Sequence, residues 1–283
     1  MTMPIRKSDC TASIGAILLD AGKISIKDAE RIIASQKQNH LRFGDAAKAL
    51  GLVSEDDIQK ALSLQFDFPF LLASEDHFSP ELIAAYQPFS SQVESLRAVR
   101  GQLMLRWFSP EQKSLSIISP NHGEGRSYIA ANLSIVFSQL GERTLLIDAD
   151  FRQPRQQNLF KLQVEYGLSD ILAGRADMSV IKRINAFRDL SVLTAGTLPP
   201  NPLDLLSRGL NVCLQQLNQQ FDVILIDTPA AEQGIDMQII TKACGGALMV
   251  ARQHQSRINA LQNLTEDLKN CGCQCLGAVI NAF

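Results

Sequence analysis

Apolar and polar positions follow two different patterns along this chain, and the change falls near residue 90. From there to the end, short apolar runs such as 115–118, 143–150 and 221–230 alternate with longer stretches of helical spacing. Such runs are typical of buried parallel strands joined by right-handed helical crossovers. We therefore expect an α/β fold in this part, a doubly wound parallel sheet with helices on both faces.

The first seventy residues contain an internal repeat with a helical pattern. Gly15 and Gly22 recur as Gly44 and Gly51, at an offset of 29 residues, and each copy continues through a serine into an amphipathic helix that ends in glutamine. A repeat of this size predicts two stacked helical hairpins. The expected division is a small all-helical domain over 1–72, a linker rich in turn formers over 73–90, and the α/β domain over 91–283.

Composition narrows the class of protein. The chain has 283 residues, of which 46% are hydrophobic and 20% charged, and its formal net charge is −2. It has neither an apolar run of about 18 residues, which would span a membrane, nor a signal peptide. A near-neutral charge gives no general reason to bind nucleic acid. Six cysteines without an export signal favour the reducing cytoplasm, and the spacing of the CGCQC cluster is poor for zinc.

The loop after the first apolar run carries the clearest chemical signal. Gly123 and Gly125 precede a helix that opens at Arg126 and Ser127, and free N–H groups at a helix N-terminus form a site for phosphate. In a phosphate-binding loop, Ser127 stands where a hydroxyl binds magnesium and Arg126 where a lysine reaches the phosphates. Pro120 also replaces the first glycine of that motif. Taken by itself, such a loop is therefore about as often a tight turn as a phosphate site.

Two of the later apolar runs end in aspartate. Asp148 and Asp150 lie at the end of 143–150, and Asp227 lies near the end of 221–230. The carboxyl ends of parallel strands meet at one edge of the sheet, where nucleotides bind. We expect these three carboxylates and Ser127 to surround one Mg²⁺ ion, which prefers oxygen ligands, retained waters and substrate phosphate. The loop and the two strands, in this order, predict a nucleotide site.

Four motifs make residues 91–283 resemble the bacterial tyrosine kinases of the exopolysaccharide chain-length-determinant (EpsG-like) type. Ser119–Ser127 resembles the family loop S-x-x-P-G-E-G-K-S except at His122 and Arg126, and Leu145–Pro154 matches LLIDADxRxP. Ile226–Ala230 matches IDTPP with one change, and Glu94, Arg97 and Arg100 supply E-x-x-R-x-x-R. The resemblance extends over almost all of 91–283 and implies a P-loop nucleotide-binding fold.

The resemblance implies phosphoryl transfer from MgATP to tyrosine hydroxyls, which rests on positioning and charge neutralisation. It implies that Asp148 accepts the tyrosine proton, that Asp150 and Asp227 arrange metal and water, and that Arg126 contacts phosphate. The implied metal ligands are Ser127, Asp148 and Asp227. The implied nucleotide-binding residues are Gly123, Glu124, Gly125, Arg126, Ser127, Tyr128 and, through the base, Asn281.

A charged helix is predicted directly after the linker. Spacing of three places Glu94, Arg97 and Arg100 on one helical face, where a solvated ion pair is the simplest interpretation. In the kinases that the chain resembles, this helix packs one subunit against the next in a ring. The resemblance therefore implies a homo-oligomer with these three residues in its interface.

The N-terminal repeat resembles the N-terminal domain of type II secretion ATPases (MshEN-like), in particular its cyclic-di-GMP-binding subset with tandem RLGxxLxxxG…Q motifs. Ser13 replaces the arginine of the first copy, which removes one charged fork that could bind phosphate or guanine. The alternative is a docking domain that binds no nucleotide. The matching residues are Gly15, Gly22 and Gln36 in the first copy, and Arg42, Gly44, Gly51 and Gln65 in the second.

Three functions stay open. The first is a tyrosine kinase and ATPase, and the second is an ATP-binding regulatory subunit of a polysaccharide co-polymerase with little phosphate transfer. The second gains weight from Arg126 and from the lack of a tyrosine-rich tail, since the tyrosines are Tyr86, Tyr128 and Tyr166. A MinD/ParA-type ATPase is the third, although Asn121 occupies the place of its signature lysine. We expect a cytoplasmic protein held at the inner membrane by a separate membrane-embedded chain-length partner.

Overall fold

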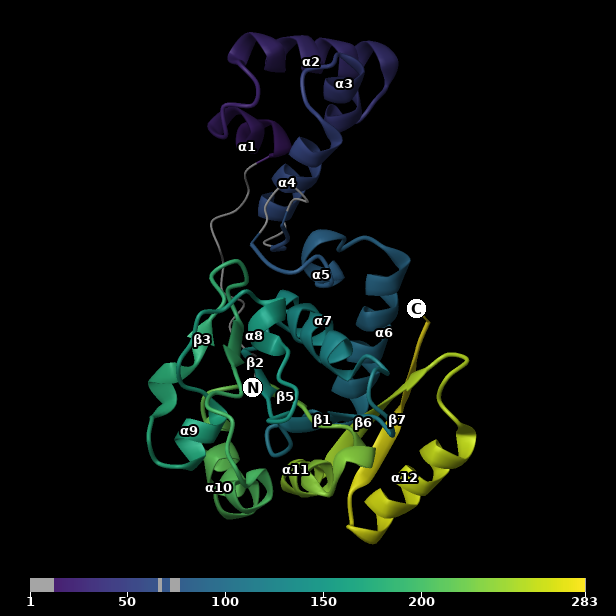
Figure 1. Cartoon of the computed structure of the whole chain (residues 1–283). Coiled ribbons are helices and arrows are strands. Elements are labelled where there is room, and N and C mark those ends of the chain that lie inside the picture. The colour runs from purple at the N-terminus through teal and green to yellow at the C-terminus, as the bar shows by residue number, and fades with distance from the viewer. Residues whose placement is uncertain (1–12, 66–67, 72–76, 283) are drawn as a thin grey trace. The chain divides into compact units, whose positions relative to one another are not determined.

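The computed structural model describes residues 13–65, 68–71 and 77–282 (Figure 1). The chain divides into two compact units, Met1–Leu72 and Ala73–Phe283. The first is helical where it is described, and the second is built on one sheet. None of the helices in the described ranges is both long and apolar enough to cross a lipid bilayer.

The first unit contains four helices, two from each copy of the repeat. They are α1 (Ile14–Asp20), α2 (Ile26–Asn39), α3 (Phe43–Ala49) and α4 (Glu55–Gln65). Gly22 and Gly51 follow α1 and α3 with the same φ of +66°, which favours glycine. However, α1 packs mainly on α4 and α2 on α3, so the copies interlock instead of forming two separate stacked hairpins. Apolar side chains from all four helices meet in the core. Its buried residues are Leu18, Ile24, Ile32, Ala46, Ala47, Ile58 and Ala61.

Equivalent serines begin the long helix of each copy. The Ser25 hydroxyl accepts a hydrogen bond from the backbone N–H of Asp28 at 3.2 Å, and the Asp28 carboxylate accepts one from the Ser25 N–H at 3.1 Å. Ser54 and Asp57 repeat this reciprocal arrangement at 3.1 and 3.0 Å. Such capping satisfies helix N–H groups that have no partner within the helix. The helix starts of this unit therefore follow from sequence neighbours only three residues apart.

The second unit is organised around a seven-stranded sheet of order β3-β4-β2-β5-β1-β6-β7. All neighbouring strands pair in parallel except β3 and β4, which pair antiparallel. This confirms the predicted doubly wound fold. The strands are β1 (Ser114–Ile118), β2 (Thr144–Asp148), β3 (Lys182–Arg183), β4 (Leu190–Leu193), β5 (Val223–Asp227), β6 (Gly246–Arg252) and β7 (Gln274–Asn281).

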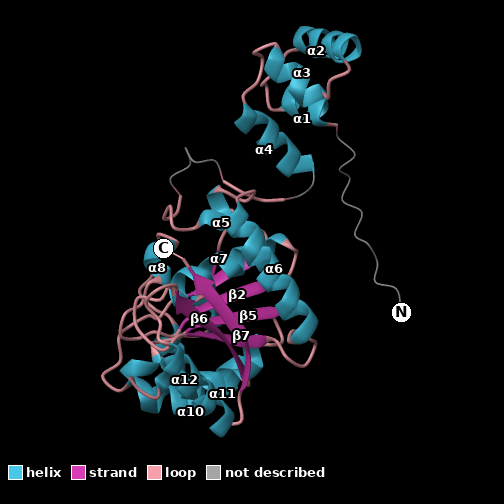
Figure 2. Ribbon diagram, turned by 90° about the vertical axis from the view of Figure 1, so that its right-hand side faces the viewer, coloured by secondary structure: helices cyan, strands magenta, loops and turns pink. Residues whose placement is uncertain are grey.

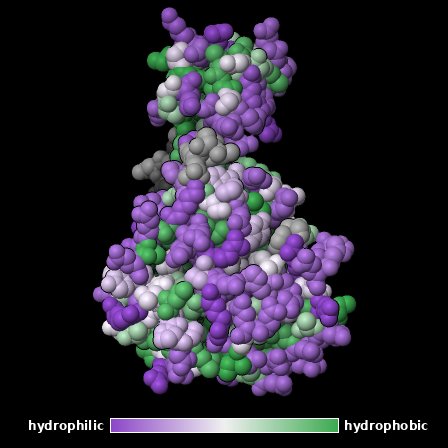
Figure 3. Space-filling view, in the orientation of Figure 1, coloured by the Kyte–Doolittle hydropathy of each residue, from purple (hydrophilic) through white to green (hydrophobic). Residues whose placement is uncertain are grey.

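Helices cover both faces of the sheet (Figure 2). Helices α5, α6, α7 and α8 lie on one face, and α10, α11 and α12 on the other (Figure 1). Strands β1, β2 and β5 are buried along their whole length. The helices are α5 (Ile83–Tyr86), α6 (Ser91–Arg106), α7 (Arg126–Gln139), α8 (Gln156–Leu159), α9 (Leu168–Leu172), α10 (Pro202–Leu217), α11 (Asp236–Cys244) and α12 (Ile258–Asn270), with 3₁₀ turns at Met178–Val180 and Ala231–Gln233. Hydrophilic residues predominate on the face of the unit seen in Figure 3, with smaller hydrophobic patches between them.

The expected linker over 73–90 is only partly a linker. Its described part, 77–90, packs on the second unit: the Ser79 N–H donates to the Leu159 carbonyl at 2.8 Å, and the Ala84 N–H to the Asn132 side chain at 2.9 Å. The Phe78 ring is buried next to the ring of Phe160. Turn-forming residues predicted a linker, but Phe78, Leu82, Ala84 and Ala85 among them are buried.

Candidate active site

The glycine loop joins β1 to α7 at the carboxyl edge of the sheet. Gly123 and Gly125 have φ values of +76° and +96°, a left-handed conformation that strongly favours glycine. Gly125 is the N-cap of α7, so the first N–H groups of the helix, from Arg126 onward, face the edge where β1 ends. The positive end of the helix dipole adds to their attraction for an anion. The structure thus forms the strand, loop and helix start that a phosphate site requires.

Arg126 is folded into this loop and is only 5% exposed. Its Nε donates to the Thr228 carbonyl at 2.9 Å, and its Nη1 donates to the Ser119 hydroxyl at 2.5 Å and the Asn121 carbonyl at 3.0 Å. The Nη2 atom lies 3.7 Å from an Asp150 carboxylate oxygen. Because the guanidinium is already surrounded by oxygen atoms, it links the loop to the ends of β2 and β5. Its prediction as a phosphate contact requires some of these bonds to be exchanged.

Glu124 is also buried, and its carboxylate points back into the protein. It accepts hydrogen bonds from the backbone N–H and the side-chain amide of Asn121, each at 2.9 Å, and from the Ser256 hydroxyl. The Glu124 carbonyl accepts a bond from Asn281 Nδ2 at 3.3 Å. Glu124 therefore fixes the shape of the loop. The same contacts bring Asn281, at the end of β7, next to the loop.

Asp148 and Asp150 shape the loop that follows β2. Asp148 accepts hydrogen bonds on both carboxylate oxygens, from the backbone N–H groups of Arg155 and Gln156 at 2.9 Å each and of Asp150 at 3.2 Å. Burial raises the pKa of Asp148 well above its usual value, and the nearby charge of Asp227 raises it further. Asp150 likewise accepts a backbone N–H bond, from Gln153 at 2.9 Å. Both carboxylates thus accept hydrogen bonds from the backbone of the loop.

Asp227, at the end of β5, keeps one carboxylate oxygen without a hydrogen bond from any described residue. Its Oδ2 accepts a hydrogen bond from Gln156 Nε2 at 2.8 Å, and the Ser127 side chain is near enough to the carboxylate to lower its pKa. Its Oδ1 is buried and has no hydrogen-bond partner among the described residues. Burial raises the pKa of Asp227 to about 6, and the positive charge of Arg126 opposes that rise. An unpaired buried acceptor is costly, so this atom fits a cation or a water molecule.

Gln156 is a site residue that sequence reasoning missed. It is fully buried at the start of α8, and its Nε2 also donates to the Ser127 carbonyl at 3.1 Å. Its Oε1 has no hydrogen-bond partner in the described part of the chain. Gln156 thus joins Ser127 to Asp227 and presents a second unused oxygen. A neutral glutamine outside any motif gives no local signal, since its partner Asp227 lies 71 residues away.

The expectation that three aspartates surround one ion stays a prediction. Within the described ranges, no three His, Cys, Asp or Glu side chains come together in a way that could hold a metal ion. Asp148 binds backbone N–H groups through both of its carboxylate oxygens, and Asp150 does so through Oδ1. Ser127 and Asp227 are adjacent, and with Gln156 they offer the oxygen atoms that suit Mg²⁺ alongside a phosphate.

Glu94, Arg97 and Arg100 lie on α6, as predicted, but all three have contacts within the chain. Arg97 pairs with Glu94 and donates to the Pro88 carbonyl at 2.6 Å. Arg100 donates to the Val136 carbonyl at 2.8 Å, and burial lowers its pKa. The pair of Glu94 and Arg97 agrees with the ion pair that their spacing indicated, and Arg100 has a partner outside α6 because α6 packs against α7.

The motif residues of the N-terminal unit have structural roles, within one copy or between the two. A Cβ atom at Gly15 would lie 3.1 Å from the Phe43 ring, and one at Gly44 would lie 3.3 Å from Ile58, so both glycines permit close helix packing. Arg42 directly precedes α3 and is exposed. Gln36 and Gln65 lie in or at the end of the last turns of α2 and α4. Packing and turn geometry account for the glycines without a ligand.

No protein-family model matches the chain. It is 32% identical over 201 residues to the tyrosine-protein kinase YwqD of Bacillus subtilis, covering 71% of this chain and 85% of that protein. The chain belongs to the bacterial tyrosine-protein kinases. It is also 30% identical to the tyrosine-protein kinase etk of Escherichia coli K12, over 70% of this chain, but spans only 28% of the length of that protein.

Solved structures of bacterial tyrosine kinases have the same fold. The kinase domain of the Escherichia coli tyrosine kinase ETK superposes with a TM-score of 0.70 at 30% identity, covering 74% of this chain and 82% of that one. The septum site-determining protein MinD of Pyrococcus horikoshii, complexed with Mg-ADP, gives a TM-score of 0.53 at 24% identity, over 60% of this chain and 70% of that one. The MinD likeness shows a shared fold, and membership of the kinase family rests on the closer relatives.

Proposed function

We propose that this chain is a tyrosine kinase and ATPase that uses MgATP and acts in exopolysaccharide polymerisation, chain length or export. The observation that carries the proposal is the group formed by Ser127, Asp227 and Gln156 at the phosphate loop, with two buried oxygens that have no partner among the described residues. The family membership supplies the reaction type, and the site supplies the means to bind its nucleotide.

Each part of the site has a role in this proposal. Backbone N–H groups of Gly123–Ser127 hold the phosphates, with Tyr128 next to them, and Asn281 contacts the base from β7. Ser127 and Asp227 hold Mg²⁺, which neutralises phosphate charge when it is bound. Asp148 receives the proton of the acceptor tyrosine, since burial raises its pKa and so makes its carboxylate a stronger base. That role requires one of its backbone hydrogen bonds to open during the reaction.

Arg126 favours a second candidate, a nucleotide-binding regulatory subunit with weak phosphate transfer. Its guanidinium binds the Thr228 carbonyl and the Ser119 hydroxyl inside the loop, so contact with a phosphate requires these bonds to be exchanged. A lysine at this position carries a compact ammonium on a flexible stem and has fewer bonds to exchange.

Phosphoryl transfer by the purified chain, measured with radiolabelled ATP and its membrane partner, separates the two candidates. We expect measurable transfer by the wild type, faster transfer by Arg126→Lys, and loss of Mg²⁺-dependent nucleotide binding in Asp227→Asn. Nucleotide binding without transfer in both the wild type and Arg126→Lys would favour the regulatory subunit. Binding unaffected by Asp227→Asn would contradict the metal site.

We propose that the chain forms a homo-oligomer through the face of α6 that carries Glu94, Arg97 and Arg100. Assembly would exchange the internal bonds of Arg97 and Arg100 for contacts with a neighbouring subunit. Reversing both arginine charges should shift the mass measured by light scattering towards the monomer. An unchanged mass, from a wild type that does assemble, argues against this interface.

For the N-terminal unit we propose a sensor of cyclic-di-GMP, with a docking domain as the alternative. Its repeat places Gln36 and Gln65 at equivalent helix ends, and two-fold repeated sites suit a ligand with two guanines. Ser13 caps α1 at 3.4 Å instead of offering a charged fork, so binding should be weak. Calorimetry should show stronger binding by Ser13→Arg and none by Arg42→Ala. No heat with either the wild type or Ser13→Arg would leave a docking domain.

We further propose that a separate membrane-embedded polysaccharide co-polymerase holds this cytoplasmic chain at the inner membrane. The support is the membership of this chain in the bacterial tyrosine-protein kinases, together with its resemblance to those of the exopolysaccharide type. Co-purification of the chain with membranes that contain that partner, and not with membranes that lack it, is the test.

A further inference from the structure

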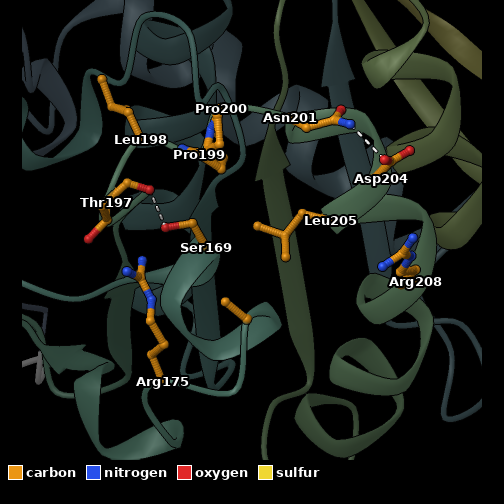
Figure 4. A pocket seen from close by; sticks show the side chains of 11 residues that line it. Ser169, Arg175, Thr197, Leu198, Pro199, Pro200, Asn201, Asp204, Leu205 and Arg208 are labelled. Atoms are coloured by element: carbon orange, nitrogen blue, oxygen red, sulfur yellow. Dashed lines mark hydrogen bonds between the residues drawn. The ribbon is translucent and has the colours of Figure 1, made fainter.

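A cavity lies at the carboxyl edge of the sheet, the edge that also carries the phosphate loop, at the place where β4 ends (Figure 4). It has a volume of about 430 Å³ and is formed by α9, the loop from β4 to α10, and the first turns of α10. A volume in this range suits a small ligand or one large side chain. No motif in the sequence pointed to this cavity, and nothing in the proposed nucleotide site uses it.

One wall of the cavity is held in place by a buried carboxylate. Asp170, on α9, is fully buried, and its Oδ1 accepts a hydrogen bond from Arg175 Nη2 at 2.6 Å. Its Oδ2 accepts bonds from the N–H groups of Gly167 at 2.9 Å and Thr197 at 3.0 Å. The Thr197 carbonyl in turn accepts the Ser169 hydroxyl at 2.6 Å. Arg175 and the loop are therefore ordered before any ligand arrives, which lowers the entropic cost of binding.

A second arginine stands on another wall. Arg208 projects from α10, is exposed, and has no hydrogen-bond or ion-pair partner in the described part of the chain (Figure 4). Asp204, which also lines the cavity, accepts the Asn201 side-chain amide at 2.6 Å. Apart from the arginines, the lining is partly polar, with Ser169, Thr197, Asn201 and Asp204, and partly apolar. Its apolar members are Ala173, Leu198, Pro199, Pro200 and Leu205.

This combination of an apolar surface and two guanidinium groups selects a particular kind of ligand. Proline and leucine side chains suit the face of an aromatic ring, and arginine binds phosphate oxygens through paired N–H groups. Arg175 keeps donors beyond the one that it gives to Asp170, because a guanidinium has five N–H groups. A phosphorylated aromatic side chain fulfils both requirements at once.

The position of the cavity in the sheet separates it from the nucleotide. Asn281 lies on the β6–β7 side of the phosphate loop, whereas the cavity lies on the opposite side, at β4. Three strand spacings, from β1 through β5 and β2 to β4, amount to about 14 Å. An extended peptide covers that distance with about four residues. A segment whose tyrosine lies at the phosphate loop can therefore place another side chain in the cavity.

We propose that this cavity binds a phosphotyrosine side chain of the protein substrate, about four residues from the tyrosine that receives the next phosphate. The proposal rests on the proposed kinase function, since phosphotyrosine is the product of that reaction. It makes the chain favour substrate segments with several tyrosines, because each phosphate added strengthens the docking of the segment for the next transfer.

Fluorescence anisotropy with the full chain, without nucleotide, tests the docking directly. The probes are labelled peptides that carry phosphotyrosine, tyrosine or phosphoserine four residues from a second tyrosine. We expect the phosphotyrosine peptide to bind most tightly, and Arg208→Ala and Arg175→Ala each to weaken it by roughly 10- to 100-fold. Arg106→Ala, which removes an exposed arginine at the end of α6, is the matched control and should leave binding unchanged.

The outcomes distinguish this proposal from the kinase function. Selective phosphotyrosine binding that depends on Arg208 supports the cavity even if the chain transfers no phosphate. If the phosphoserine peptide binds as tightly as the phosphotyrosine peptide, or if Arg106→Ala weakens binding as much as Arg208→Ala does, the effect is one of general charge. Either result overturns the proposal. ATP hydrolysis measured without peptide should be the same in Arg208→Ala and the wild type. Arg208→Ala that leaves phosphotyrosine binding unchanged also overturns the proposal.

Discussion

The two units of this chain reach their structures by different means. In the helical unit, the helix starts depend on contacts that are short in sequence: serine caps bind three residues ahead, and α1 and α4 then pack together around a core with seven buried apolar residues among those described. In the α/β unit, buried side chains connect distant segments, such as Arg126 with Thr228 across 102 residues. The difference teaches that the helix starts of the repeat can be predicted from residues close in sequence. A site assembled from several strands depends instead on how those strands pair.

The largest effect should come from the small core of the helical unit. Ile32 is fully buried on α2, whereas the next residue, Ile33, is 44% exposed. Ile32→Ala should destabilise the unit by about 2–5 kcal/mol, because it removes buried methyl groups and leaves a cavity. Hydrogen–deuterium exchange of the full chain should then be faster in α1–α4.

Ile33→Ala is the matched control and should change the stability by less than about 0.5 kcal/mol. Peptides from β1, β2 and β5 should exchange at the wild-type rate in both variants. Faster exchange throughout the α/β unit of Ile32→Ala would contradict the independence of the two units.

The second largest effect should come from a long-range contact in the α/β unit. Gln156→Ala removes an oxygen beside the expected metal and a bond to Asp227, so the Mg²⁺-dependent affinity for ADP should fall by about 10- to 100-fold. Titration of a fluorescent ADP analogue, with Mg²⁺ or with a chelator, measures this. Gln153→Ala, in the same loop but exposed, is the control. An equal loss in the presence of the chelator would indicate a folding defect instead.

The smallest effect concerns acid stability of the helical unit. A hydrogen bond from Lys23 is the main cause that lowers the pKa of Asp57 to about 2, and bonds from Ser54 add to it. A carboxylate with a depressed pKa stabilises the fold above its unfolded pKa near 4, and this contribution is lost as the pH falls towards 2. NMR cross-peaks of α4 should weaken over this range.

Asp57→Asn should reduce that pH dependence, since the side chain no longer titrates. Its helix is expected to be less stable at pH 7 than the wild-type helix, because the ion pair with Lys23 at 2.8 Å is lost. A wild-type unit whose NMR spectrum stays constant between pH 5 and pH 2 would argue against this ion pair.

Sequence reasoning predicted local features well and distant contacts poorly. The order of apolar runs predicted the parallel strands, and the glycine spacing predicted the turn at Gly123 and Gly125. It did not find Gln156, and it took 77–90 for a linker although Phe78 is buried against the sheet unit. It could not see that Asp148, through both oxygens, and Asp150, through Oδ1, bind backbone N–H groups.

By itself the sequence determined the classes of the two units, the position of the phosphate loop and the helix starts at Ser25 and Ser54. These depend on hydrophobic period, glycine conformation and capping, all of which act between near neighbours. Only the tertiary structure decided that Arg126 turns into the loop and that Gln156 joins Ser127 to Asp227. It also decided that a cavity forms at the end of β4. The physical reason is that buried polar groups must find partners, and strand pairing decides which distant partners lie within reach.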